Sequence, residues 1–160
     1  MIAVLILLAV LVVATGVGIL VRRNEGRVRA TGSKAATTAP VADAGAPESN
    51  RAALLAAAGL VAGRPTVLHF SADWCGPCAA VRRVVASVVT ELSDGERPPL
   101  DLELDIDANP ELARELNVLS LPTTFVFDSR GLECFRISGV PKAADLRSSL
   151  APLTVSAAAE

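Results

Sequence analysis

The chain has 160 residues, which fits one small domain with additional segments. Its formal net charge is −2, which gives no indication of nucleic-acid binding, so we expect no nucleic-acid partner. Hydrophobic residues make up 51% of the chain but aromatic residues only 3%, so alanine, valine and leucine must fill any core. Part of the apolar excess lies at the N-terminus.

The N-terminal segment, residues 2–21, carries no charge and is interrupted only by Thr15, Gly16 and Gly18. Its length matches the ~20 residues with which a helix crosses a bilayer. A cleaved signal peptide is the alternative, but no basic residue precedes this segment, its apolar run is longer than usual for such a peptide, and no small-residue cleavage site closely follows. We therefore predict a transmembrane helix over residues 1–22.

Residues 23–50 are predicted to form a linker that is basic at first and then flexible. The basic part contains one acid, Glu25, and is followed by an Ala-, Thr-, Gly-, Ser- and Pro-rich stretch too poor in apolar side chains to fold. Positive charge is retained on the cytoplasmic side of membranes, so this cluster predicts a single-pass protein with a cytoplasmic domain. An extracytoplasmic domain, with the cluster only contacting lipid headgroups, is the alternative. The cluster consists of Arg22, Arg23, Arg27, Arg29 and Lys34.

Hydrophobic periodicity and turn residues predict a folded domain over residues 51–153 and a tail over residues 154–160. The expected order is α-β-α-β-α-β-β-α. The segments are helix 51–62, strand 66–70, a helix from 78, strand 100–107, helix 110–116, strand 123–128, strand 132–138 and helix 142–150.

The strand at residues 100–107 alternates without a break between apolar and acidic residues. We interpret Asp101, Glu103, Asp105 and Asp107 as a solvated face. A divalent-metal site is the weaker alternative, because four carboxylates along a strand spread over ~20 Å.

Two cysteines lie two residues apart in the segment Trp74-Cys75-Gly76-Pro77-Cys78, between a predicted strand and a predicted helix. Unpaired backbone N–H groups and the helix dipole at a helix start favour a thiolate, so we expect Cys75 to be the nucleophile. Cys78 lies about one turn further on and would resolve the mixed disulfide that Cys75 forms. Gly76 and Pro77 keep the loop short, and Pro77 loses only an N–H that lacks a helical partner.

Two other interpretations of the cysteine pair are weaker. A zinc site needs about two more ligands, and the chain offers only Cys134 and His69. A purely structural disulfide would close a very short loop and stabilise little. The pattern of a strand followed by a helix favours a redox pair.

Several motifs share their order and spacing with one known family. They are the WCGPC segment, the Asp-Ile-Asp-Ala-Asn-Pro run at residues 105–110, Leu121-Pro122-Thr123, and the glycines at 131 and 139. On these motifs, residues 51–153 resemble a thioredoxin. The resemblance implies an α/β, thioredoxin-like fold, with a central mixed β-sheet flanked by α-helices, here preceded by the transmembrane helix.

The resemblance also assigns roles around the cysteine pair. It implies that Pro122 is cis and lies beside the disulfide, where the backbone of Leu121 pairs with an extended substrate peptide. Without the resemblance, Pro122 would be interpreted as an ordinary proline at the start of a strand. Trp74 is expected to form an apolar wall beside Cys75, or simply to cover the loop.

The sequence departs from the family pattern behind the active site. His69, the only histidine, stands where the family usually keeps a buried aspartate that helps deprotonate the resolving cysteine. A neutral imidazole can accept that proton, although a packed residue without a catalytic part is the alternative. Glu103 replaces the accompanying lysine, and Ser71 replaces a tryptophan. Cys134 is expected to be a buried, inert thiol.

We therefore expect a membrane-tethered, monomeric thiol-disulfide oxidoreductase that reduces protein disulfides without a cofactor or metal. The Gly-Pro between the cysteines matches reducing members of the family. Electrons would come from a thioredoxin reductase in the cytoplasm, or from a membrane thiol relay outside it. The alternatives are an extracytoplasmic reductase for cytochrome c maturation or envelope thiols, and a redox-inactive module that binds peptides at Pro122.

Overall fold

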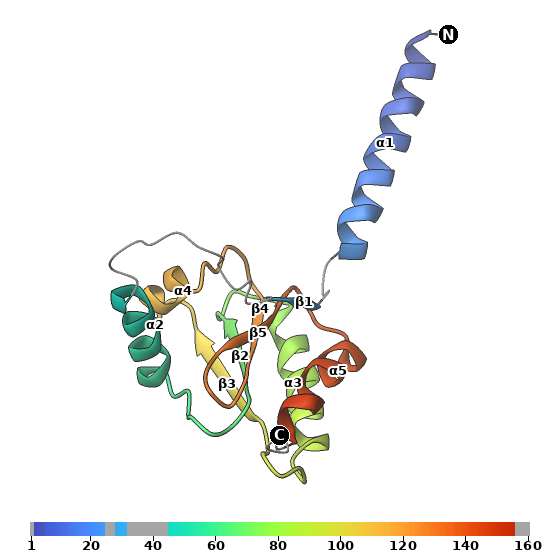
Figure 1. Cartoon of the computed structure of the whole chain (residues 1–160). Helices are drawn as coiled ribbons and strands as arrows, with labels where there is room; N and C mark the ends of the chain where they lie inside the picture. The colour runs from blue at the N-terminus through green and yellow to red at the C-terminus, as the bar shows by residue number, and fades with distance from the viewer. Residues whose placement is uncertain (1, 25–27, 32–44, 156–160) are drawn as a thin grey trace, which may run out of the picture.

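Five β-strands form a mixed sheet at the centre of the structure, a computed structural model that describes residues 2–24, 28–31 and 45–155 (Figure 1). The strands are β1 (Val28–Ala30), β2 (Thr66–Ser71), β3 (Leu100–Asp105), β4 (Thr123–Phe127) and β5 (Glu133–Ser138). They lie in the order β1-β5-β4-β2-β3. Only β2 and β3 run parallel, and the other neighbours pair antiparallel.

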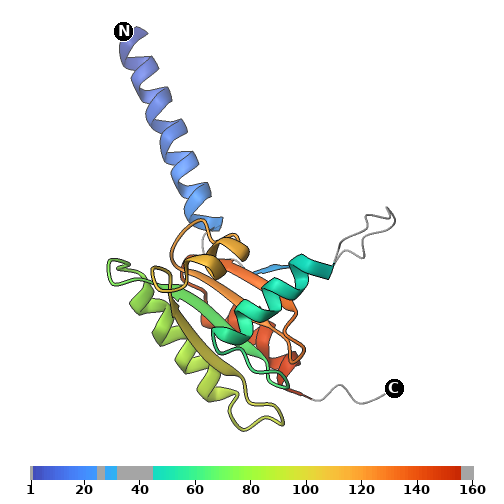
Figure 2. The same ribbon diagram turned by 90° about the vertical axis from the view of Figure 1, so that its left-hand side faces the viewer.

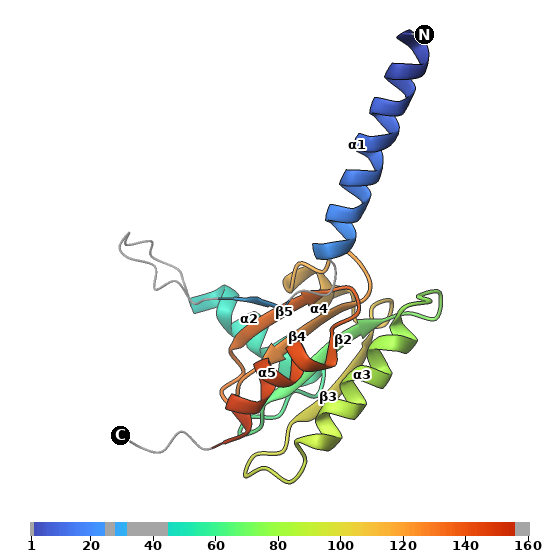
Figure 3. The ribbon, with the colours of Figure 1, turned by 90° about the vertical axis from the view of Figure 1, so that its right-hand side faces the viewer.

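Helices cover both faces of the sheet. α2 (Gly45–Ala57) and α4 (Pro110–Glu115) lie on one face (Figure 2). α3 (Cys78–Glu91) and α5 (Ala143–Thr154) lie on the other (Figure 3). The predicted order of elements from residue 51 onward is confirmed, as is the mixed sheet flanked by helices.

The central strand β2 explains why the core has two halves. All six of its residues are buried, and successive side chains point to opposite faces of the sheet. Phe70 packs in the half under α2 and α4, while Val67 packs in the half under α3 and α5. The valines of α3 at positions 81, 85 and 88 recur at helical spacing and are fully buried, each stabilising the fold by roughly 1.5–3 kcal/mol.

Element ends differ from the predicted ones by a few residues. β3 ends at Asp105 rather than at residue 107, because the Asp105 carboxylate accepts hydrogen bonds from the backbone N–H groups of Asp107 and Ala108 and turns the chain. α2 begins at Gly45, inside the predicted linker, and α5 continues to Thr154. Of the predicted tail, residues 156–160 lie outside the described residues, as do residues 25–27 and 32–44 of the linker.

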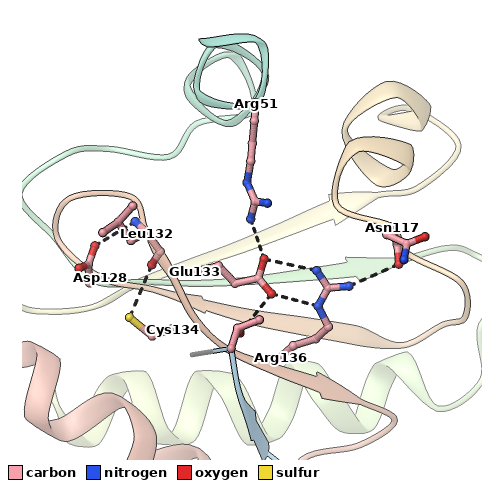
Figure 4. Close-up of polar contacts among 8 residues, drawn as sticks. Arg51, Asn117, Asp128, Leu132, Glu133, Cys134 and Arg136 are labelled. Carbon is pink, nitrogen blue, oxygen red and sulfur yellow. Dashed lines mark hydrogen bonds and ion pairs between the residues drawn. The ribbon is translucent and has the colours of Figure 1, made fainter. Parts of the chain in front are cut away.

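A short strand, β1, also lies within the predicted linker. Its three residues pair with β5 at the edge of the sheet, and the next residue, Thr31, donates its backbone N–H to the Cys134 carbonyl. The Glu133 carboxylate fixes this edge by accepting hydrogen bonds from Thr31, Arg51 of α2 and Arg136 of β5 (Figure 4). Three residues are too few to show a period of two, so hydrophobic patterning does not predict this strand.

Helix α1 (Ile2–Asn24) extends away from the domain (Figure 1). Several of its large apolar side chains are exposed, among them Ile6, Val10 and Val17. Judged on the described residues alone, no helix is both long enough and apolar enough to be a membrane span. The predicted transmembrane helix is therefore not established by the structure.

Candidate active site

The two cysteines of the CxxC segment form a disulfide where β2 passes into α3. Their Cα atoms are 5.5 Å apart. Helix α3 begins at Cys78, with Pro77 as its N-cap residue, so Cys75 precedes the helix start. Cys78 is only 1% exposed, whereas Cys75 is half-buried. An incoming disulfide can therefore reach Cys75 and not Cys78. This agrees with the predicted roles of Cys75 as nucleophile and Cys78 as resolving cysteine.

The N-terminal end of α3 supplies the electrostatic environment of the nucleophile. No acidic residue lies in the first turn of this helix, so the positive end of its dipole is not neutralised by a carboxylate there. Such an end favours the thiolate of Cys75 over the thiol once the disulfide is reduced. Gly76 and Pro77 are exposed and leave the approach to Cys75 open.

Trp74 lies beside this approach and is 70% exposed. Its indole Nε1–H donates a hydrogen bond to Asp107 Oδ2 at 3.3 Å, which holds the ring next to the segment that follows β3. Most of the ring surface is therefore available for contact with a substrate. Asp107 follows the end of β3 and contacts a residue of the cysteine segment. The sequence does not single it out, because it continues the alternation of apolar and acidic residues that begins in β3.

Leu121 and Pro122 lie at the same end of the sheet as the disulfide. Phe70 of β2 pairs with Thr123 of β4, and these strands are antiparallel, so β4 begins beside the point where β2 leads into the cysteine loop. The peptide bond between Leu121 and Pro122 is cis, which confirms the expected geometry. Pro122 is buried, and its carbonyl accepts a hydrogen bond from the Gly139 N–H at 2.8 Å.

His69 lies in the layer between the sheet and α3. It shares the face of β2 that carries Val67, which packs against the valines of α3, and it is only 2% exposed. Its Nε2 lies 3.1 Å from Asp101 Oδ1 on the neighbouring strand β3. Cys78 Sγ lies 3.9 Å from the carbonyl oxygen of Phe70, the residue after His69. The imidazole and the buried sulfur thus occupy the same layer.

The other acids of β3 also have partners, so the acidic row is more than a solvated face. Arg82 of α3 donates from Nε to both carboxylate oxygens of Glu103, at 2.7 and 2.9 Å. Partial burial acts to raise the pKa of Glu103, but hydrogen bonds from Ser71 and Arg82 outweigh it and hold that pKa below its ordinary value. Glu103 is thus ionised and neutralised by Arg82, where the family has a lysine.

Cys134 is half-buried rather than fully buried. Its Sγ lies 3.6 Å from the Leu132 carbonyl oxygen (Figure 4). Burial, and then the nearby Asp128 carboxylate, raise the pKa of this thiol. A raised pKa leaves little thiolate at neutral pH, which agrees with the expected inert role. Among the described residues, no group of three His, Cys, Asp or Glu side chains could hold a metal ion.

This geometry defines a class of protein, in which a half-buried, accessible nucleophilic cysteine and a buried resolving cysteine exchange disulfides beside a cis-proline. The thioredoxin family model matches residues 57–152, more than half of the chain. The chain belongs to the thioredoxin family, and Cys75 and Cys78 are its active-site dithiol, that of a protein-disulfide reductase.

Relatives in several organisms share this domain. The chain is 39% identical to a thioredoxin of Mycolicibacterium smegmatis over 85 residues, which cover 52% of this chain and 74% of that one. It is 42% identical over 90 residues to a bifunctional thioredoxin reductase/thioredoxin of Mycobacterium leprae, covering 55% of this chain but only 19% of that protein. The X-ray structure of Fasciola hepatica thioredoxin superimposes with a TM-score of 0.50 at 26% identity, covering 66% of this chain and 93% of that one.

Proposed function

We propose that this protein reduces disulfides in extended protein segments and works at a membrane surface. The observation that carries the first part is the unequal burial of Cys75 and Cys78 next to Pro122. Cys75 is the accessible sulfur, and an extended segment that carries a disulfide can lie along Pro122 while it reaches this sulfur. Within the described residues, the backbone N–H and carbonyl of Leu121 make no hydrogen bond, and they are free to pair with such a segment.

The reaction proceeds in two exchange steps. The Cys75 thiolate attacks one sulfur of the substrate disulfide, forms a mixed disulfide and releases the other substrate sulfur as a thiolate. Cys78 then loses its proton and attacks the Cys75 sulfur, which closes the Cys75–Cys78 disulfide and releases the second substrate thiolate. Two electrons pass from the dithiol to the substrate, and the released thiolates take up protons to leave as thiols.

His69 is the proposed acceptor of the Cys78 proton. It is buried in the same layer as the Cys78 sulfur, and a neutral imidazole is a suitable base near neutral pH. Among the described residues it is the only histidine, and the carboxylates of β3 have their own partners. A base is needed at this position because burial disfavours the charged thiolate of Cys78.

The membrane tether is proposed from residues 2–21, which are uncharged and as long as a bilayer-crossing helix. The exposed apolar side chains of α1 support the tether, because water would solvate them poorly. Arginines at positions 22, 23, 27 and 29 favour a cytoplasmic domain by the positive-inside rule. In that compartment a thioredoxin reductase would supply the electrons, whereas an outward-facing domain would need a membrane thiol relay.

Two measurements test this proposal. The full chain in neutral detergent should reduce insulin disulfides with dithiothreitol as electron source, and a Cys75→Ser variant should not. Equal activity of the variant and the parent would contradict the reductase.

For the tether, membranes from expressing cells are washed with carbonate, and intact cells are treated with a membrane-impermeant thiol reagent. We expect the chain to stay with the membranes and Cys75 to be labelled only after lysis. Release by carbonate would refute the tether. Labelling of intact cells would reverse the orientation and favour the envelope role, including cytochrome c maturation.

A further inference from the structure

We infer that Asp101 is a positioning residue that keeps the proton of neutral His69 on Nε2, so that Nδ1 is the atom that accepts the Cys78 proton. The inference rests on the proposed reductase function and assigns a role to a residue of the acidic row. It concerns proton transfer in the second exchange step, the attack of Cys78 on the mixed disulfide.

The tautomer follows from the chemistry of the two groups in contact. His69 Nε2 and Asp101 Oδ1 are 3.1 Å apart, which is a hydrogen-bond distance. An ionised carboxylate can only accept, so Nε2 must donate and carry the hydrogen. A neutral imidazole has one N–H, and Nδ1 is therefore left with a free lone pair. A base for Cys78 needs such a lone pair inside the protein.

Of the polar groups around the imidazole, Asp101 is the one that can fix which ring nitrogen carries the hydrogen. From β3, Glu103 also faces the histidine, but its carboxylate is bound by Arg82 of α3 and by Ser71. From β4, the residue paired with His69 is Thr124, whose buried side chain is neutral. Among the described residues, Asp101 is thus the one carboxylate that is hydrogen-bonded to the ring.

Asp101 also connects the buried histidine to water. β3 is the edge strand of the sheet, and the Asp101 side chain is 33% exposed, whereas His69 is 2% exposed. After Nδ1 accepts the thiol proton, both ring nitrogens of the imidazolium carry hydrogen, and the partly solvated Asp101 carboxylate balances its charge. When the Cys75–Cys78 disulfide is next reduced, the departing Cys78 thiolate takes the proton back from Nδ1, which restores the Nε2–H tautomer.

The test isolates the second exchange step with a small disulfide, dithiobis-nitrobenzoate, mixed rapidly with the reduced full chain in neutral detergent. All proteins carry Cys134→Ala so that two thiols remain. Attack by Cys75 releases one coloured thionitrobenzoate, and attack by Cys78 on the mixed disulfide releases the second. The rate of the second release reports deprotonation and attack by Cys78.

Asp101→Asn should slow the second release about tenfold and leave the first release unchanged. The estimate is below the roughly 10²–10⁴-fold that a general base contributes, because Asp101 acts through His69 and is partly solvated. In a His69→Gln background, the same substitution should have no further effect. The matched control is Glu91→Gln, which removes a carboxylate from an exposed ion pair with Arg147 on the same side of the sheet and should change neither phase.

The outcomes separate this inference from the reductase function. An unchanged second phase in Asp101→Asn, or a slowing that persists in the His69→Gln background, would overturn the positioning role while leaving the reductase intact. A parent chain that releases only one thionitrobenzoate would contradict the proposed function and, with it, the role of Asp101. Nitrogen-15 NMR of the single histidine gives a readout besides activity: the reduced parent should carry its ring proton on Nε2, and a proton on Nδ1 would refute the assignment.

Discussion

The Glu133 carboxylate should stabilise the domain only while it is ionised, and Glu133→Gln should reveal this. The carboxylate accepts hydrogen bonds from Arg51 at 2.6 Å, from Thr31 at 3.3 Å, and from Arg136 at 3.0 and 3.3 Å. These partners come from α2, from the residue after β1, and from β5 itself (Figure 4). One side chain therefore links three elements that are far apart in sequence.

The expected loss of stability in Glu133→Gln depends on the hydrogen bonds to arginine that a glutamine amide cannot accept as a carboxylate does. Glu133 is 7% exposed at its side chain, while Arg51 and Arg136 are 33% and 28% exposed, so water partly solvates both cations after the substitution. Hydrogen bonds to charged groups contribute roughly 1.5–3 kcal/mol each when buried, and partial exposure lowers this. The glutamine keeps one carbonyl oxygen as an acceptor. We expect a loss of about 2 kcal/mol in the free energy of unfolding at neutral pH.

The stabilisation by Glu133 depends on pH because the pKa of this carboxyl differs between the folded and unfolded chain. Burial acts to raise the pKa of Glu133, but the hydrogen bonds from Arg136 and Arg51 outweigh it, so the folded pKa lies below the ordinary value. The stabilisation is therefore complete above the unfolded pKa of ~4.3 and disappears as the pH falls through the folded pKa. The assay is urea unfolding of the full chain in neutral detergent, followed by the fluorescence of Trp74, the only tryptophan. A difference between parent and Glu133→Gln that stays constant into the acid range would refute the role of the ionised carboxylate.

Three further predictions follow from the site and the core. Val85→Ala should lower the free energy of unfolding by about 2 kcal/mol in the same urea assay. The side chain is fully buried between α3 and the sheet, and truncating it leaves a cavity. An unchanged unfolding midpoint would show that the helix is not packed as described. Asp107→Asn should weaken the hydrogen bond from the Trp74 indole and slow insulin reduction about threefold, with the free energy of unfolding unchanged. The effect is small because hydrogen bonds to charged groups contribute about 1.5–3 kcal/mol at most. A rate equal to that of the parent would show that reduction does not depend on this hydrogen bond. Cys134 should react with iodoacetamide at neutral pH much more slowly than reduced Cys75, because its pKa is raised. Its rate of labelling should increase as the pH rises. Mass spectrometry of modified peptides measures both rates, and labelling of Cys134 as fast as that of Cys75 would contradict the prediction.

Much of the fold was predictable because its signals are local. The apolar alternation of β3 and the helical spacing of the α3 valines depend on periods of two and 3.6 residues, which the sequence displays directly. The strand β1 was not predictable, since three residues show no period and their pairing with β5 depends on contacts distant in sequence. The end of β3 at Asp105 also escaped prediction, because a side-chain hydrogen bond to the following backbone, rather than a change in hydrophobic pattern, turns the chain.

The site shows the same division between local and distant information. The CxxC motif predicts the cysteine pair, the resemblance to thioredoxins implies the cis bond before Pro122, and the structure shows both. The sequence pattern does not identify Asp101 and Asp107 as the partners of His69 and Trp74, although both belong to the acidic row at residues 101–107. A period of two says which face of the strand a carboxylate occupies. It does not say which residue of the next strand lies opposite, and that register decides whether the acid is solvated or bonded.

Trapping the mixed disulfide tests the roles of the two active-site cysteines. Full-length chain with Cys78→Ser and Cys134→Ala is mixed with oxidised insulin in neutral detergent, and the covalent product is mapped by mass spectrometry. We expect a stable adduct through Cys75. No such adduct should form when Cys75→Ser replaces Cys78→Ser, because the resolving sulfur is buried. An adduct that forms through Cys78, or no adduct with either variant, would contradict the assignment of Cys75 as the nucleophile and Cys78 as the resolving thiol.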